Sequence, residues 1–189
     1  MVSKYQNIFK TLLEMLSDRH FDISDFKNDQ ISSYEEINNL IVKNKNNDTC
    51  IKIYYNIDDK IGINYIKNII SDLESYSENI SGLVILNTAI TTFAKQFLNS
   101  EQNSQHIEYF KESDLMTNKT KHYLIPKHIL LSKNEKNKFL SDLKCDESHI
   151  PRIKNTDPIA QYYGSKVGDI FKIIRHDDNT PSIYYRLCI

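Results

Sequence analysis

The stretch IPRIKNTDPIAQYYGSKVGDIFKIIR, residues 150–175, carries the clearest local folding signals in this 189-residue chain. Asp157 stands where an N-cap is expected, and Pro158 suits the first helical position, which needs no amide hydrogen. Gly164 suits the left-handed residue that ends a helix. These signals predict a short helix over DPIAQYYG, followed by a strand at DIFKIIR.

The flanking segments predict a small mixed β module with one or two helices packed on it. A second strand is expected at SIYYRLC, residues 182–188, after the turn-forming residues HDDNTP at 176–181. Residues 131–143 predict a helix, because Ser132 and Glu135 form a capping-box pattern. We expect its buried face to consist of Phe139, Leu140 and Leu143.

Toward the N-terminus, patterns typical of helices and strands alternate. Their alternation predicts an α/β domain with at least one parallel strand pair, and the whole chain is therefore expected to be α+β. All four prolines lie between Pro126 and Pro181, which favours a domain at 1–118 and another at 119–189. Helices are expected over 3–19, from Ser33 (capped with Glu36) to Lys43, and over 62–75 and 91–99, with strands over 50–55, 83–87 and 107–110.

Composition excludes several classes of protein. With 40% hydrophobic and 26% charged residues, the chain is typical of a globular protein, and no apolar run approaches the roughly 20 residues that span a membrane. A formal net charge of −1 indicates that any DNA contact is local or shared with a partner. The three cysteines, Cys50, Cys145 and Cys188, are odd in number and widely spaced, so we expect a reducing, intracellular setting.

The sequence contains no common catalytic signature. Phosphate-binding, dinucleotide-binding and hydrolase motifs are absent, and the separation of His122 and His128 does not suit a pair of metal ligands on one helix. One alternative is a magnesium-dependent nuclease built on Asp58, Asp59 and Lys60, which follow a predicted strand. The next strand lacks the acid-x-lysine that such sites need, and a polar turn explains these residues more simply.

A second candidate site lies at TAITTFAKQFL, residues 88–98. Thr91 and Thr92 precede a predicted helix that carries Lys95, and free amides at a helix N-terminus bind phosphate. The alternative is an ordinary threonine cap.

From HYLIPKHILLS (122–132) through residues 150–189, the chain resembles the C-terminal module of the fifth subunit of eukaryotic RNA polymerases, which has a single-domain relative in archaeal polymerases. Weaker similarity to the family's jaw domain covers residues 10–24 and 61–98, which implies the two-domain eukaryotic form. The matching positions are Leu124, Pro126, His128, Pro151, Arg152, Ile153, Asp157, Pro158, Ala160, Tyr162, Gly164, Lys166, Gly168, Lys172, Ile173, Arg175, Tyr185 and Arg186.

The resemblance implies a non-catalytic subunit that has no cofactor or metal of its own. Its C-terminal module would dock on the largest polymerase subunit, and its N-terminal jaw would face downstream duplex DNA. No membrane partner and no homo-oligomer are expected. The implied DNA-proximal residues are Thr91, Thr92 and Lys95, and the implied docking residues are Pro151, Arg152, Asp157, Pro158, Tyr162, Lys166, Arg175, Tyr185 and Arg186.

Two positions depart from the family pattern. Thr92 replaces a usual proline in the loop near DNA, and Gln161 replaces a usual arginine in the short helix. The abundance of Asn, Ile and Lys indicates an AT-rich genome, either of a large DNA virus or of a protist. The subunit is then expected in the nucleus if cellular, or in a virion or cytoplasmic viral factory if viral. A transient polymerase-binding regulator remains the alternative to a core subunit.

Overall fold

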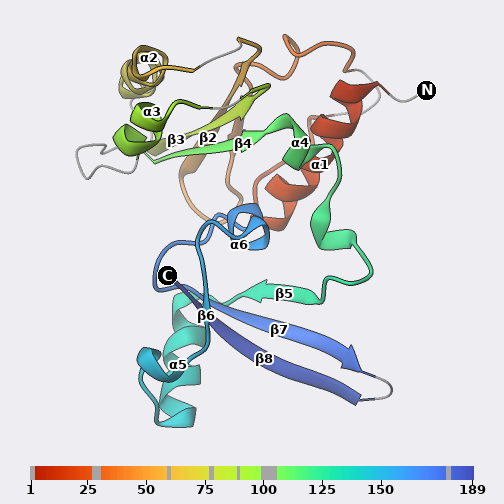
Figure 1. The fold of residues 1–189 in the computed structure, drawn as a ribbon, viewed down its shortest axis with the longest axis vertical. Coiled ribbons are helices and arrows are strands. Elements are labelled where there is room, and N and C mark those ends of the chain that lie inside the picture. The colour runs from red at the N-terminus through yellow and green to blue at the C-terminus, as the bar shows by residue number, and fades with distance from the viewer. Residues whose placement is uncertain are drawn as a thin grey trace. The chain divides into compact units, whose positions relative to one another are not determined.

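The computed structural model describes residues 3–26, 31–58, 61–76, 79–88, 90–98, 106–177 and 180–189. The chain divides into two compact units, Met1–Thr117 and Asn118–Ile189. Each unit has its own four-stranded sheet (Figure 1). No described helix is long and apolar enough to cross a membrane.

The N-terminal unit is built on a sheet with the strand order β1-β2-β3-β4. Strand β2 pairs in parallel with β3, and β3 in parallel with β4, whereas β1 joins β2 antiparallel, so the predicted parallel pair is confirmed. Every residue of β2 after the first is buried, as expected of a strand covered on both faces. The strands are β1 (Ile41–Lys43), β2 (Thr49–Asn56), β3 (Asn79–Leu86) and β4 (Ile107–Lys111).

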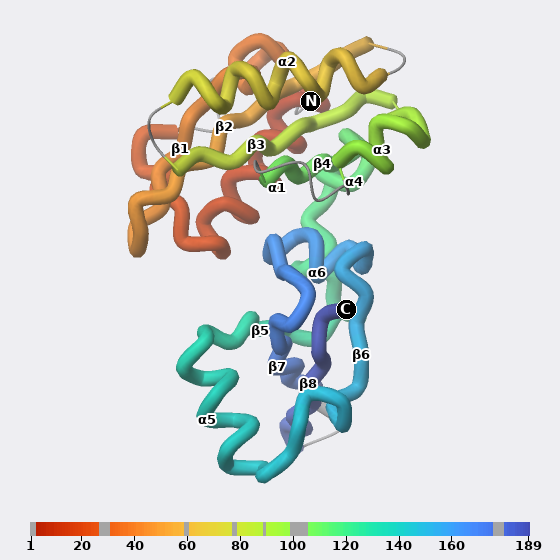
Figure 2. The backbone as a smooth tube through the Cα atoms, turned by 90° about the vertical axis from the view of Figure 1, so that its left-hand side faces the viewer, coloured from red at the N-terminus to blue at the C-terminus, as the bar shows by residue number. Residues whose placement is uncertain are grey.

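Helices cover both faces of this sheet (Figure 2). On one face, apolar residues of α2 pack against alternate residues of β2 and β3. On the other face lies α1, whose Tyr5 ring is 6.1 Å from the ring of Tyr55 in β2. The helices are α1 (Lys4–Asp18), α2 (Ile63–Glu74), α3 (Thr92–Leu98) and α4 (Glu112–Leu115).

The prediction of a helix from Ser33 to Lys43 is wrong. Glu36 does bind a serine, but the partner is Ser32, whose amide and hydroxyl both donate to the carboxylate. The chain forms turns there and then continues as β1. Tertiary hydrogen bonds explain the difference, since the amide of Asn39 donates to Ile53 in β2 (2.7 Å) and β-branched residues favour the following strand.

The C-terminal unit contains a sheet with the strand order β5-β7-β8-β6. Strands β7 and β8 form a long antiparallel pair, β5 joins β7 antiparallel, and the very short β6 joins the end of β8 in parallel. Residues 176, 177, 180 and 181, which were expected in a turn, belong to the two strands, and residues 178 and 179 lie outside the described part of the chain. The strands are β5 (Lys127–Leu130), β6 (Arg152–Ile153), β7 (Ile170–Asp177) and β8 (Thr180–Cys188).

Separate helices cover the two faces of this sheet. Ala160 of α6 packs with Phe171 and Ile173 of β7, whereas Phe139 and Leu140 of α5 pack with Ile170 and other residues of the opposite face. The capping box of Ser132 and Glu135 is confirmed, but Leu143, the last residue of α5, is exposed and does not belong to the packed face as expected. The helical elements are η2 (Lys119–Lys121), α5 (Lys133–Leu143), η3 (Glu147–His149) and α6 (Pro158–Tyr162).

The predicted fold class is thus confirmed: an α/β unit followed by a small mixed β module with packed helices.

Candidate functional site

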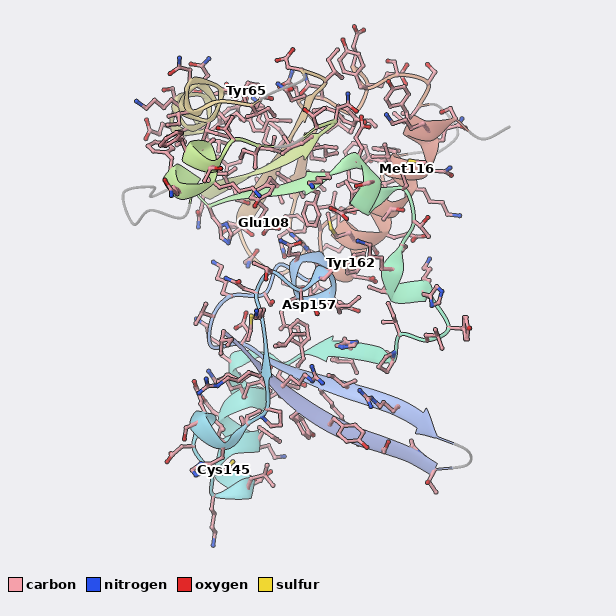
Figure 3. The ribbon with its side chains drawn as sticks, in the orientation of Figure 1. Tyr65, Glu108, Met116, Cys145, Asp157 and Tyr162 are labelled. Carbon is pink, nitrogen blue, oxygen red and sulfur yellow. The ribbon has the colours of Figure 1, made fainter. Side chains whose placement is uncertain are left out.

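The short helix α6 has the caps that its sequence predicts. The side chain of Asp157 accepts a hydrogen bond from the amide of Ile159 (2.9 Å), and Pro158 occupies the first turn. Gly164 adopts φ 61°, the left-handed conformation that glycine accommodates at least cost. Figure 3 labels Asp157 and Tyr162 at the two ends of this helix. Asp157 and Gly164 therefore have a demonstrable structural role, whatever else they contact.

Tyr162, one of the residues implied in docking, is buried. Its side chain is only 6% exposed, and its hydroxyl accepts a hydrogen bond from the amide nitrogen of the Asn118 side chain (3.1 Å). Asn118 is itself buried and caps η2. Tyr162 thus ties α6 to the start of the C-terminal unit and offers little surface to a partner.

The loop between α6 and β7 is held by polar contacts to its backbone. The amide of Lys166 donates to the carboxylate of Asp169 (2.7 Å), and the Lys166 side chain is exposed. Lys136 of α5 donates to the carbonyl of Gly168 (2.6 Å) and pairs with Glu147 (2.6 Å). Gly168 adopts φ 95°, so a side chain there would strain the turn. The loop thus presents the Lys166 ammonium from a fixed backbone.

Arg175 of β7 and Arg186 of β8 are exposed on the same face of the sheet. The register pairs Arg175 with Ser182, Ile173 with Tyr184 and Phe171 with Arg186, and paired residues share a face. The guanidinium carbon of Arg175 lies 5.0 Å from the ring centroid of Tyr184, within the range of a cation–π contact. Among the side chains that the structure describes, which exclude those of residues 176–179, no carboxylate pairs with either arginine.

His128 of β5 lies on this face too, because it pairs with Ile173. Its Nδ1 is 2.7 Å from the carbonyl oxygen of Pro126, and its ring packs edge-on against Phe171. Burial lowers its pKa, the positive charges of Arg186 and Arg175 lower it further, and the Pro126 carbonyl and Asp157 oppose them. His128 therefore has a packing role on this face of the sheet, against Phe171.

Three further residues implied in docking lie elsewhere in the unit. Arg152 is exposed and shares the opposite face with its register partner Leu187. Tyr185 is half-buried on that face, with its ring 4.0 Å from the ring of Phe139 in α5. Pro151 is exposed, and its carbonyl accepts from the amide of Leu187 (2.8 Å). The implied docking residues therefore do not form a single patch, since they divide between two faces of the sheet.

The N-terminal candidate at Thr91 is a threonine cap. The Thr91 hydroxyl accepts from the amide of Ala94 (3.3 Å), and its carbonyl accepts from the amide of Lys95 (3.0 Å). Thr92 and Lys95 are exposed on α3, which has only 7 residues. Phe93 is 72% exposed beside them.

The structure gives no support to a nuclease site. Asp58 forms a turn in which its amide donates to the side chain of Asn56 (2.7 Å), and its carboxylate accepts from the same side chain (3.1 Å). Asp59 and Lys60 lie outside the described residues. Elsewhere in the described ranges, no three His, Cys, Asp or Glu side chains gather as metal ligands would.

One polar cluster of the N-terminal unit was not indicated by the sequence. Lys52 of β2 is 6% exposed, and its ammonium donates to Asp72 of α2 (2.5 Å) and to the hydroxyl of Tyr76 (3.0 Å). The hydroxyl of Tyr54 also donates to Asp72 (2.6 Å). These hydrogen bonds, from Lys52 first, lower the pKa of Asp72, while burial and the bond to Asp72 raise the pKa of Tyr54.

Comparison with known proteins identifies relatives along the whole chain. Residues 117–188 match the family model described as RNA polymerase Rpb5, C-terminal domain. Subunit rpabc1 of the DNA-directed RNA polymerases I, II, and III of Dictyostelium discoideum is 34% identical over 195 residues, which cover 100% of this chain and 98% of the relative. Subunit RPABC1 of Caenorhabditis briggsae is 30% identical over 96% of this chain and 94% of its own length. DNA-directed RNA polymerase subunit 5-like protein 1 of Arabidopsis thaliana is 29% identical over 100% and 97% respectively.

Proposed function

The chain belongs to the Rpb5 family of RNA polymerase subunits, and we propose that its C-terminal unit docks on the largest subunit of a multisubunit DNA-directed RNA polymerase. The chain is a non-catalytic component of that polymerase. The observation that carries the proposal is a relative, itself a polymerase subunit, that is 34% identical over the whole chain. Nucleotidyl transfer and its metals belong to the larger subunits.

Of the residues implied in docking, the exposed cations are those that the structure favours for contact with a partner. Arg152, Lys166, Arg175 and Arg186 are all exposed, and arginine is enriched at protein interfaces. Buried Tyr162 contributes by holding α6 in place rather than by direct contact. The remaining implied residues, Pro151, Asp157, Pro158 and Tyr185, support the backbone and the packing around these cations.

We propose that the N-terminal unit contacts downstream DNA only locally, through the exposed residues around α3. Residues 1–117 contain 11 Lys and Arg against 17 Asp and Glu, a formal net charge of −6. Such a unit is repelled by phosphates at long range, so the polymerase has to hold it near the duplex. Thr92, Phe93 and Lys95 are among the exposed residues of α3 and are available for contact.

Charge reversal tests the docking proposal. We expect Arg175→Glu and Arg152→Glu to reduce incorporation of tagged chain into the polymerase more than they lower the melting temperature of the isolated chain. Lys138→Glu is the matched control, because Lys138 is an exposed cation of α5 on the same unit. Equal losses of incorporation and of stability would assign the two arginines a structural role.

The same pull-down distinguishes a core subunit from a regulator. A core subunit co-purifies in stoichiometric amount and resists salt, whereas a transient regulator co-purifies at a lower ratio and is washed off. We further propose that the gene comes from a large DNA virus, on the strength of the Asn, Ile and Lys bias, with an AT-rich protist as the other source. The polymerase would accordingly work in a viral factory or a nucleus. Mass spectrometry of the purified complex would identify which polymerase the chain belongs to.

A further inference from the structure

The outer edge of β8 is open along most of its length. Strand β7 pairs with β8 from Thr180 to Leu187, but β6 covers the opposite edge only at Leu187 and Cys188. Figure 1 shows β5 running beside β7, whereas no described strand runs beside the far part of β8. β6 is short because the chain arrives at Pro151, which has no amide hydrogen with which to extend the ladder.

Register identifies the backbone groups that face outward from this edge. The amide of Leu187 donates across the outer edge to Pro151, and the amide of Cys188 points the other way, to Asp169. Since the direction alternates along a strand, the amides and carbonyls of Ile183 and Tyr185 also point outward. The backbone of Pro181 also faces outward by this alternation. Its missing amide hydrogen therefore removes no hydrogen bond between β7 and β8.

Side chains beside the open edge are apolar and basic. Ile183 is 51% exposed on one face and Tyr184 is 47% exposed on the other. Tyr184 lies between Arg175 and Arg186, which have no carboxylate partner among the side chains that the structure describes. The C-terminal unit contains 13 Lys and Arg against 8 Asp and Glu, a formal net charge of +5. Among the described residues, the edge thus combines outward-facing backbone groups that no strand pairs with two arginines that no described carboxylate neutralises.

We propose that the edge of β8 from Pro181 to Arg186 binds an extended, carboxylate-bearing segment of another polymerase subunit, which adds a strand in line with β6. The backbone of Ile183 and Tyr185 pairs with the added strand. Arg175 and Arg186 pair with its acidic side chains, and Tyr184 packs between them. The inference rests on the proposed function, because the segment comes from the polymerase.

A protein segment suits this edge better than a nucleic acid. A peptide strand alternates donors and acceptors at the spacing that the backbone of Ile183 and Tyr185 requires, whereas a phosphate backbone offers acceptors alone. An isolated open edge also invites association with any exposed strand, and proteins commonly cover or charge such edges. Incorporation into the polymerase would cover it.

Hydrogen exchange in the intact polymerase tests the backbone part of the proposal. Polymerase purified through the tagged chain is compared with the isolated chain, using peptides that contain Ser182 to Arg186. We expect two further protected amides in the polymerase, those of Ile183 and Tyr185, exchanging at least about tenfold more slowly. Unchanged exchange of these amides in a chain that does co-purify would overturn the edge proposal and leave the proposed function intact. Failure of the wild-type chain to co-purify would instead refute the proposed function.

A proline scan separates backbone pairing from side-chain contact. Ile183→Pro removes an outward donor but no bond to β7, whereas Ile183→Thr keeps both the amide and a β-branched side chain. We expect the proline variant to lower incorporation roughly fivefold or more and the threonine variant to incorporate normally, with similar melting temperatures. Equal losses for the two variants would contradict strand addition. Recovery of single-stranded or duplex nucleic acid, rather than a protein segment, cross-linked at Tyr184 would also overturn it.

Discussion

Removing Asp72 should destabilise the N-terminal unit far more than removing the lysine that it binds. Asp72→Ala leaves the ammonium of Lys52, whose side chain is 7% exposed, without its anion, and it leaves the hydroxyl of Tyr54 without its acceptor. Breaking a fully buried pair from one side costs about 3–5 kcal/mol. The Asp72 side chain is 41% exposed, so water compensates in part. We therefore expect Asp72→Ala to lower the free energy of unfolding by about 2–3 kcal/mol.

Lys52→Met makes the opposite change at the same site. It keeps an unbranched apolar stem in the space between β2 and α2 and removes the buried charge. Asp72 then keeps the hydrogen bond from Tyr54 and its access to water. The expected cost is below about 1 kcal/mol, and the double variant should be more stable than Asp72→Ala alone.

Urea unfolding that is monitored by the hydrogen exchange of peptides from β2 and β3 reports on this unit alone. A cost for Lys52→Met that equals or exceeds that of Asp72→Ala would refute the reasoning. The pKa of Asp72 is lowered in the folded chain from its ordinary value of 3.8, chiefly by Lys52. Its contribution is therefore complete above that value and is lost as the pH falls through the lowered pKa. The difference between wild type and Asp72→Ala should accordingly persist at neutral pH and shrink below about pH 4.

Three smaller changes test other contacts, each by urea unfolding of the full chain. Gly82→Ala should cost about 1–2 kcal/mol, because the new Cβ would lie 3.1 Å from a leucine methyl of α2; a neutral result would mean that α2 can shift. Asp157→Ala should cost about 1 kcal/mol and Asp157→Asn only a few tenths, since both Asp and Asn cap helices; equal costs would exclude capping as the main role. Tyr162→Phe should cost about 1 kcal/mol through the bond from Asn118, and a normal stability would show that water replaces it.

Local signals predicted the C-terminal unit well. Asp157, Pro158 and Gly164 act within a few residues of their own position, so the helix they bound could be read from the sequence. The helix expected from Ser33 failed for the opposite reason. Its capping pattern was a local match, but the backbone there is determined by hydrogen bonds with the neighbouring strand, from the amide of Asn39 to Ile53 and from the amide of Ile53 to Leu40.

The ion pair of Lys52 and Asp72 could not be predicted from the periodicity of the sequence. Lys52 interrupts an apolar strand, and the residues next to it in the sequence do not indicate which side chain it binds. Asp72 faces it only because β2 and β3 pair in a particular register and α2 crosses them at Gly82, where the absent side chain leaves room. The meeting of Arg175 with Tyr184 also depended on register, in this case that of the β7–β8 pair.

The strand order of the C-terminal unit constrains the order in which its strands can pair during folding. Among the described strands of this unit, β7 and β8 are the one pair that is consecutive in sequence. Between β5 and β7, which pair at Lys127–Ile174, lie α5, β6 and α6, and between β6 and β8, which pair at Arg152–Leu187, lie α6 and β7. Short-range hairpins close fastest, so β7 and β8 should meet first and the outer strands should join later. Until α5 and α6 settle on its two faces, this hairpin exposes Phe171 and its apolar neighbours to the solvent. Aggregation during refolding at high protein concentration should therefore begin in this unit, before its helices have packed on the sheet.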